Sequence, residues 1–465
     1  MAALRASNSI LFIEFIARPS AANLQALLHH AATLTLPYVT LHYRRFLTAK
    51  SLRRPLTATE AQPISTGIST GTRRWTLVTL LAAATFINYL DRGSLAVALP
   101  VVSKDLGFGP FEQGILLSAF FWTYAAMQIP MGWMVDRYNI KWLYAGAFAL
   151  WSLSAAATGL ATGLLSLLLF RVLLGLGESV YLPGGMKVVS LHFKGEESAW
   201  PSGFFDLGAK LGLAAGTAID VWLLVRFGWR SLFFRTGLAG LIWLIPWLWL
   251  YPSRRGRAIS PVPAVNWKSL LTNRTLLGIS LGFFCWDYFW YFIISWLPSY
   301  LYSVRHVSMV KVGIFGSIPY LVFALAEALG GWGAGALVRR GWDFSRVTKG
   351  MIAAGLAMGL LVIPAALVDS QAASIAFLLG ASLSGLVCGN LLVIPKVCAP
   401  DHEVALWTGV QNFTGNIGGV LAPAITGLLI AQTHSYNSSF LLVSAVLLLG
   451  MMAYLFLVPR LKPES

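Results

Sequence analysis

Ionisable side chains occur inside segments of this sequence that are otherwise apolar. Asp91 and Arg92 end the segment NYLDR, and Arg171 and Glu178 lie seven residues apart in a later segment. On a helix, that spacing puts Arg171 and Glu178 on one face about 10 Å apart along the axis, too far for a direct pair. Each needs a partner on another helix, and Asp91 and Arg92 are the candidates.

Two interpretations of these four groups remain open. They could form a structural salt-bridge network, or the arginines could bind an anion while the acids carry protons. An arginine holds a carboxylate with two hydrogen bonds. A carboxyl group inside a membrane can change its protonation near neutral pH. On the second interpretation, Asp91 and Glu178 are candidate proton-coupling groups, and Arg92 and Arg171 are candidate substrate ligands.

Further charged residues lie in later apolar segments. Asp206 and Lys210 are four residues apart and should face each other on one helix, as a self-neutralised pair or with Lys210 as a second positive group for the substrate. Asp220 is expected at the membrane interface. Asp287 and Glu327 are possible extra charge sites. Glu327 has no obvious local cation, so it is either a second proton site or a buried neutral carboxyl group.

Aromatic and amide side chains supply candidate contacts for a polyhydroxylated substrate. Tyr124 ends the run FFWTY, and Tyr291 ends the run WDYFWY. Their hydroxyl groups can hydrogen-bond to a ligand, although most aromatic residues in such helices only pack. Asn412 and Asn416 lie one helical turn apart in a glycine-rich segment, and we expect at least one of them to line a cavity.

The composition excludes several classes of protein. Of the 465 residues, 57% are hydrophobic and only 11% are charged, whereas a soluble chain carries about 25% charged residues. This excludes a soluble enzyme, a disordered chain and a disulfide scaffold. The sequence has no phosphate-binding Walker loop and no His-Glu-x-x-His motif. It therefore predicts no enzyme, no cofactor and no metal site.

Twelve segments are long and apolar enough to be transmembrane helices of about 20 residues. Six lie before and six after a polar stretch, and they cover residues 75–99, 112–135, 141–161, 163–186, 200–225, 230–251, 275–302, 311–338, 347–367, 371–396, 404–431 and 437–459. The sequence thus predicts an all-α membrane protein with twelve transmembrane helices in two pseudo-symmetric six-helix bundles. Repeated halves with a site between them are a transporter design.

The net charge of +16 does not indicate a nucleic-acid partner. Residues 1–74 hold nine Lys or Arg residues against two acids, and most other basic residues lie in short loops. If the chain before Trp75 is cytoplasmic, inside loops hold fifteen Lys or Arg residues and outside loops hold five. This asymmetry favours cytoplasmic positions for both termini.

Four parts of the chain follow from this pattern. Residues 75–251 form the N-terminal bundle, residues 252–273 a cytoplasmic linker and residues 274–460 the C-terminal bundle. Residues 1–74 form an extension with three interpretations: a mis-assigned start or disordered tail, an organellar transit peptide, or an amphipathic segment on the membrane surface. A transit peptide would place the protein in an organelle envelope; otherwise we expect a bacterial inner membrane.

Three motifs together resemble the major facilitator superfamily and, within it, the anion:cation symporter family. They are NYLDR at residues 88–92, the loop motif with Gly132, Asp136 and Arg137, and the segment from Arg171 to Glu178. The segment SWLPSYL at residues 295–301 fits the same family. The resemblance covers residues 75–460 and implies alternating access, with the Gly132 to Arg137 loop as a conformational gate.

The resemblance also implies a function. Relatives import sugar acids with protons, and others carry phosphate, sialic acid or glutamate. By position, Asp91 and Glu178 match the proton-coupling acids of the sugar-acid carriers, while Arg92 and Tyr124 match substrate ligands. Arg171 matches a residue linked to both, and Asn412 or Asn416 matches a ligand. The chain departs from the family at Asp206, Lys210 and Asp287, where it often has amides, and this leaves the substrate open.

We therefore expect a proton-coupled symporter of an organic anion, a hexonate, hexuronate or aldarate. The alternative is a sodium-coupled or exchange carrier of phosphate or another small anion. A membrane sensor is disfavoured because the chain has no sizeable soluble output segment. The expected partners are the organic anion, protons and membrane lipids, and we expect a monomer.

Overall fold

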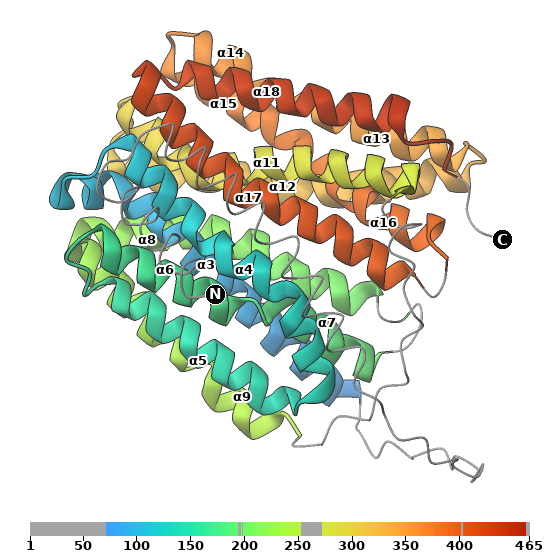
Figure 1. Ribbon diagram of the computed structural model, residues 1–465, viewed down its shortest axis with the longest axis horizontal. Coiled ribbons are helices and arrows are strands. Elements are labelled where there is room, and N and C mark those ends of the chain that lie inside the picture. The colour runs from blue at the N-terminus through green and yellow to red at the C-terminus, as the bar shows by residue number, and fades with distance from the viewer. Residues whose placement is uncertain (1–70, 194–196, 198, 253–271, 401–402, 462–465) are drawn as a thin grey trace, which may run out of the picture. The chain divides into compact units, whose positions relative to one another are not determined.

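The computed structural model describes residues 71–193, 197, 199–252, 272–400 and 403–461. Nearly all of the predicted extension and most of the predicted linker lie outside these residues. Within the described part the chain is almost entirely helical and contains no β-strand. The helices up to α9 and those from α11 onward form two groups in Figure 1, as the two predicted bundles require.

The N-terminal half consists of seven helical segments. They are α3 (Gly71–Leu106), α4 (Pro110–Arg137), α5 (Ile140–Thr158), α6 (Leu164–Glu178), α7 (Tyr181–His192), α8 (Ala199–Leu241) and α9 (Leu244–Leu250). Buried aromatic rings hold these helices together. Trp243 stacks on Phe148 with a centroid distance of 4.2 Å, and it donates a hydrogen bond to the carbonyl oxygen of Leu80 at 2.7 Å.

The C-terminal half begins with the most deeply buried helix of the two halves, α11. Its helices are α11 (Arg274–Ser303), α12 (Met309–Arg339), α13 (Phe344–Gly359), α14 (Val362–Leu367), α15 (Gln371–Ala381), the 3₁₀ helix η2 (Ser382–Val387), α16 (Cys388–Cys398), α17 (Val404–Thr433), α18 (Asn437–Met452) and the π-helix η3 (Ala453–Leu457). Helix α11 packs against α17, α18 and α3, so it contacts both halves.

The twelve predicted spans can be matched to these helices. Among the described residues, nine helical stretches are long and apolar enough to cross a membrane. One of them, Trp200–Leu250, contains two predicted spans, which are divided at Gly228, where φ is 78°. Helices α3 and α5 provide the remaining two spans. The chain is therefore a multi-pass membrane protein.

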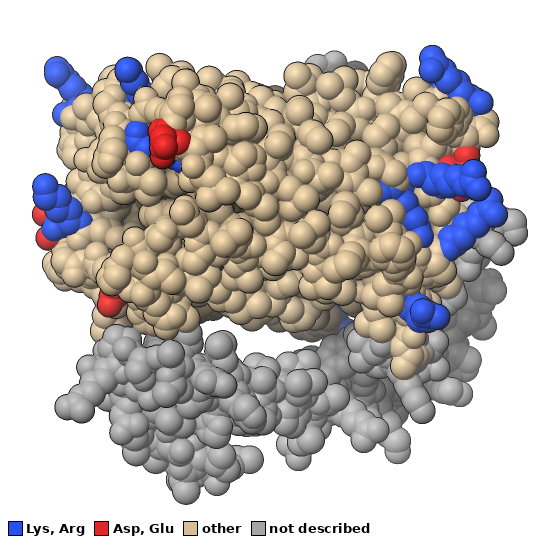
Figure 2. All heavy atoms as spheres, turned by 90° about the horizontal axis from the view of Figure 1, so that it is seen from above, with Lys and Arg blue, Asp and Glu red and all other residues tan. Residues whose placement is uncertain are grey.

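Large apolar side chains cover much of the outer surface. Leu165, Trp249 and Phe456 are 71%, 82% and 80% exposed. On the face in Figure 2, Lys, Arg, Asp and Glu gather toward the two ends, and the band between them carries none. An exposed apolar band between charged ends fits the hydrocarbon layer of a membrane, whereas in water it would promote aggregation.

The fourth span of each half is interrupted, which the sequence prediction of continuous spans did not anticipate. Helix α6 ends at Glu178, and α7 begins after two turn residues. Pro183 lacks the N–H that would bond to the carbonyl of Ser179, so the regular helix is broken there. In the other half, η2 interrupts the span between α15 and α16. Such irregular segments within spans line cavities in transporters.

The two halves meet most closely where α4 begins and α17 ends. A Cβ atom on Gly114 would lie 2.6 Å from the carbonyl oxygen of Pro423, and one on Gly427 would lie 2.4 Å from that of Pro110. The Ser118 hydroxyl donates a hydrogen bond to the carbonyl of Val420 at 2.7 Å. Only glycine allows the two backbones to approach this closely, so the halves are closed at this end.

We predict that Gly114→Ala lowers the melting temperature of the purified protein. The new methyl group must push α4 away from α17, which typically costs about 1–3 kcal/mol. Gly146→Ala on α5 is the matched control, since nothing lies within 4 Å of its new Cβ. Alanine is the better helix former by up to about 1 kcal/mol, so this variant should melt at the same or a higher temperature. Equal effects of both variants would contradict the close contact.

Candidate functional site

A buried ion pair joins the first and fourth spans. Arg92 Nε lies 2.8 Å from Glu178 Oε2, and the two side chains are 4% and 0% exposed. For Glu178, this confirms the expectation that a partner lies in the first span. A fully buried pair is strongly destabilised if one partner is removed, because the other charge remains without compensation.

Two glycines of α6 explain how Glu178 reaches this position. A Cβ on Gly175 would lie 2.1 Å from the carbonyl oxygen of Phe120, and one on Gly177 would lie 2.8 Å from that of Ala147. Helix α6 therefore lies directly against α4 on one side and α5 on the other. Larger residues would move the helix outward and carry Glu178 away from Arg92.

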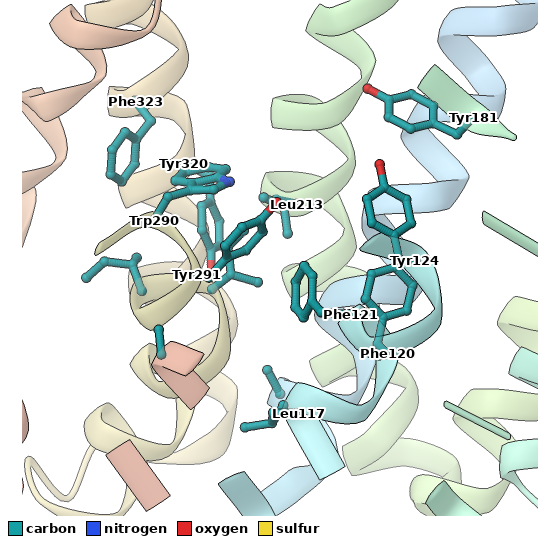
Figure 3. Close-up of a cluster of buried hydrophobic side chains, with 14 of the residues drawn as sticks. Leu117, Phe120, Phe121, Tyr124, Tyr181, Leu213, Trp290, Tyr291, Tyr320 and Phe323 are labelled. Atoms are coloured by element: carbon teal, nitrogen blue, oxygen red, sulfur yellow. The ribbon is translucent and has the colours of Figure 1, made fainter. Parts of the chain in front are cut away.

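Aromatic rings surround the Arg92 guanidinium. Its Cζ lies 4.7 Å from the ring centre of Tyr89, 4.8 Å from Phe120, 4.4 Å from Tyr124 and 5.9 Å from Tyr181. Figure 3 shows Phe120, Tyr124 and Tyr181 together on one side of the central space. Contacts between a cation and aromatic faces each stabilise the charge, by about 0.5–2 kcal/mol.

Several polar atoms behind Arg92 lack hydrogen-bond partners within the described part of the chain. They include Arg171 Nε and one terminal nitrogen of Arg92. Trp151 lies within hydrogen-bonding reach of Asp91, and Asn88 lies within reach of Glu178. Most buried polar groups in proteins are satisfied, so a cluster of exceptions calls for an explanation. Water, exchangeable protons or a ligand could satisfy these atoms.

A cavity of about 160 Å³ lies between the two halves. Its lining includes nine of the residues that the sequence singles out, namely Arg92, Tyr124, Asp206, Lys210, Asp287, Tyr291, Glu327, Asn412 and Asn416. Arg171 is not among them; it lines a smaller adjoining pocket together with Arg92 and Tyr291. The structure thus brings most of the candidates to one space, with Asp91 and Glu178 outside its lining.

Lys210 pairs with one carboxyl group in each half of the protein. It pairs with Asp206 on its own helix, as the spacing predicts, and its Nζ lies 3.0 Å from Glu327 Oε2 on α12. Glu327 therefore has a cation partner that its own sequence neighbourhood does not reveal. The two residues are far apart in the sequence, so only the packing of α8 on α12 brings them together.

A chain of hydrogen bonds runs from Tyr291 along α17. The Tyr291 hydroxyl donates to Asn416 Oδ1 at 3.3 Å, and Asn416 Nδ2 donates to Asn412 Oδ1 at 2.9 Å. The Tyr291 ring also meets Phe121 of α4, with centroids 4.4 Å apart. Tyr291 thus presents polar atoms to the cavity while its ring closes the space between the halves (Figure 3).

Other residues of the lining were not selected from the sequence. Tyr89 lies three positions before Arg92 and so shares a helix face with it, and this spacing could have identified it. Trp286 and Trp290 lie in an aromatic run that was noted as a whole. Tyr181 and Cys388 gave no signal, because their positions depend on the interruptions of the two fourth spans.

Asp220 is buried within the protein. It is 0% exposed and accepts a hydrogen bond from Ser94 of α3 at 2.9 Å. Its expected position at the membrane interface stays a prediction.

The loop motif lies at the end of α4. Lys187 of α7 pairs with Asp136 at 2.6 Å, and the Arg137 guanidinium lies 4.9 Å from the ring centre of Trp133. A Cβ atom on Gly132 would meet nothing within 4 Å. None of the three motif residues lines the cavity. Among the described residues, no group of three or more His, Cys, Asp or Glu could hold a metal ion.

Acidic residues at helix ends outside the predicted spans accept hydrogen bonds from nearby side chains. Arg230 and Trp229 donate hydrogen bonds to Asp105 at 2.8 Å and 2.9 Å, and these bonds keep the pKa of Asp105 below its ordinary value. Arg460 does the same for Asp343, whose carboxylate also caps the first turn of α13. These pairs connect helix ends and lie outside the cavity, so we look for functional charges among the residues around the cavity.

Comparisons with known proteins agree with one another. The family model described as Major Facilitator Superfamily matches residues 81–423. The chain is 30% identical to the D-galactonate transporter of Escherichia coli O6:H1, over 84% of this chain and 97% of that one. It is 30% identical to a probable galactarate/D-glucarate transporter, GudP, of Bacillus subtilis, over 84% and 92% of the two chains.

A hexuronate transporter of Bacillus subtilis is 29% identical, over 81% of this chain and 93% of its own. Among solved structures, a bacterial homologue of the human lysosomal transporter Spinster superposes with a TM-score of 0.72 at 19% identity. That match covers 85% of this chain and all of the other. It supports the fold.

We predict that Arg92→Gln destabilises the protein by about 3–5 kcal/mol, because Glu178 then remains buried without a cation. Thermal unfolding of the purified protein measures this. The double variant Arg92→Gln with Glu178→Gln should recover most of the stability, since it removes both charges. A single variant as stable as the unmodified protein would show that the pair contributes no net stability.

Proposed function

Because this chain belongs to the major facilitator superfamily and is a transporter, we propose that it is a proton-coupled symporter of a sugar acid, a hexonate, hexuronate or aldarate, that works by alternating access. The observation that carries the proposal is the Arg92–Glu178 ion pair beside the cavity. It places an anion-binding group and a protonatable group in direct contact. The named activities of the relatives support the choice of sugar acids.

Protonation of Glu178 is the central step of this mechanism. While Glu178 is ionised, it occupies the Arg92 guanidinium and competes with the substrate carboxylate. A proton neutralises Glu178 and frees Arg92, whose face toward the cavity can then hold the carboxylate with two hydrogen bonds. The surrounding rings keep Arg92 charged and in place during the exchange. Proton binding and anion binding thus favour each other.

Asp91 is the second proton site of the proposal. Its carboxyl group is 3% exposed, and the indole of Trp151 lies within hydrogen-bonding reach of it. It interacts electrostatically with both Glu178 and Arg171. A proton that arrives at Asp91 therefore changes the field at Glu178, because two neighbouring carboxylates disfavour joint ionisation.

Polar tips around the cavity would hold the substrate hydroxyl groups. Tyr124 lies on the N-terminal side, and Tyr291, Asn412 and Asn416 lie on the C-terminal side. Hydroxyl and amide groups both donate and accept hydrogen bonds, as a polyol requires. Inorganic phosphate would leave most of these groups unused, which favours the organic substrate over the alternative.

Alternating access requires the two halves to separate where they now touch. With both termini in the cytoplasm of a bacterial cell, the end closed by Gly114 and Gly427 would face outward. Rocking would also part Lys210 from Glu327. Asp206 lies on the same helix as Lys210 and would keep the cation paired during the movement. This arrangement lowers the cost of breaking the link between the halves.

We predict that Glu178→Gln abolishes accumulation of D-galactonate driven by a pH gradient. The glutamine cannot take up and release a proton, although it leaves Arg92 free to bind the anion. Uptake of labelled D-galactonate into proteoliposomes with an acidic exterior measures accumulation, and exchange without a gradient measures binding and movement. Exchange should persist in the variant.

The control for this experiment is Asp105→Asn, which removes an acid paired at a helix end outside the cavity. It should accumulate the substrate normally. Normal gradient-driven accumulation by Glu178→Gln would exclude Glu178 as the coupling site.

We also predict that sugar acids stabilise the purified protein more at about pH 5.5 than at about pH 7.5, because protonated carboxyl groups leave the arginines free. A ligand at a hundred times its dissociation constant stabilises by about 2.7 kcal/mol. A thermal-shift screen of D-galactonate, D-glucarate, D-glucuronate and phosphate measures this. Stabilisation by phosphate alone, or dependence on sodium instead of pH, would favour the alternative carrier.

A further inference from the structure

The charged groups of the cavity are distributed unevenly between the two halves. The cations of its lining, Arg92 and Lys210, both lie on the N-terminal half, on α3 and α8. The charged residues that the C-terminal half contributes to the lining, Asp287 and Glu327, are both acids. The N-terminal side of the cavity therefore offers two cations and one acid, Asp206, to a ligand, whereas the charged groups described on the opposite side are both acids.

Asp287 is the acid without a counterpart. Arg92 is paired with Glu178, and Lys210 is paired with Asp206 and Glu327. Asp287 has no ion pair or hydrogen bond within the described ranges, although it is only 6% exposed and lines the cavity. A carboxylate in such a place is costly unless a proton or a cation joins it.

Glycine holds the Asp287 carboxyl group in position. A Cβ on Gly415 of α17 would lie 2.0 Å from Asp287 Oδ2, so no other residue at 415 would leave room for it. The carboxyl group is therefore fitted between α11 and α17, and its direction is set by the packing of these helices. Packing alone does not require a carboxyl group at this position, because a smaller apolar side chain would also fit.

Aromatic residues share the lining of the cavity with Asp287. The indoles of Trp286 and Trp290 stack with centroids 6.0 Å apart, and Trp290 meets Phe323 at 4.7 Å. All three line the cavity together with Asp287, and Figure 3 shows Trp290 and Phe323 on the side opposite Tyr124 and Tyr181. Aromatic faces around a carboxylate form the usual environment for an ammonium group.

We infer that the C-terminal half of the cavity, where Asp287 shares the lining with Trp286 and Trp290, is a subsite for an ammonium group, and that the preferred substrate is an amino-substituted sugar acid. The inference rests on the proposed function for the carboxylate end, which Arg92 binds. A dipolar substrate matches the two sides of the cavity. A simple sugar acid would instead add a negative charge to a lining in which acids already outnumber cations.

The test compares D-gluconate with two close analogues, 2-amino-2-deoxy-D-gluconate and 6-amino-6-deoxy-D-gluconate, which differ only by an ammonium group in place of a hydroxyl group. Thermal shift of the purified full chain gives their dissociation constants. We expect at least one amino analogue to bind about tenfold more tightly than D-gluconate. The two positions allow for either distance between the carboxylate and the ammonium group.

Asp287→Asn is the decisive variant, because it keeps the shape and removes the charge. It should lose the preference for the amino analogue and bind D-gluconate as well as before or better. Asp369→Asn, an exposed residue outside the cavity, is the control and should keep the preference. The inference is overturned if D-gluconate binds as tightly as both amino analogues, or if Asp287→Asn weakens all three ligands equally.

Failure of the proposed function would look different. Binding measured by thermal shift does not need proton coupling, so loss of gradient-driven accumulation would refute the symport and leave the ammonium subsite to be judged on binding alone. Conversely, normal accumulation of D-galactonate with no preference for an amino group would retain the symport and refute the subsite.

Discussion

The buried pair of Arg92 and Glu178 is the interaction on which the rest of the site depends. An isolated charge in the interior of a membrane protein is too costly to keep, so each of these groups is stable only while the other, or a substitute, is present. That condition makes the ion pair sensitive to protons and to anions. A proton can substitute for the arginine at Glu178, and an anion can substitute for the glutamate at Arg92. In the proposed mechanism, the same energetic constraint holds the helices together and couples the two ligands.

Several features of the fold exist to make this pair possible. Gly175 and Gly177 let α6 approach both neighbouring helices, and the break before Pro183 ends that helix at Glu178. Rings from three helices enclose Arg92 and reduce the penalty when its partner is neutral. The arrangement leaves Asp91 buried beside Glu178 and Arg171, where the proposed mechanism places an exchangeable proton.

The sequence predicted the fold well because membrane spans carry their own signal. Length and apolar composition identify each helix without reference to its neighbours, and all twelve predicted spans correspond to helical segments. The sequence also predicted contacts between site residues that lie one helical turn apart. The pairing of Asp206 with Lys210 and of Asn412 with Asn416 follows from a spacing of four residues.

What the sequence did not reveal depends on packing between distant helices. The contact of Glu327 with Lys210 arises from the approach of α12 to α8, and the burial of Asp220 arises from the face of α3 that covers it. The interruptions of the two fourth spans are also invisible to an apolar count, so residues that they place, such as Tyr181 and Cys388, were missed.

The arrangement of charges around the cavity determines which of them stay paired when the two halves separate. Each cation of the lining has an acid within its own half: Glu178 for Arg92 and Asp206 for Lys210. The N-terminal half can therefore move as a unit without exposing an unpaired positive charge. The acids of the C-terminal half have no such internal partner in the lining, so their charge must be met across the cavity, by Lys210, by protons or by the ligand. A transporter built in this way binds most strongly when the two halves and the ligand are together, and it loses that attraction as the halves separate.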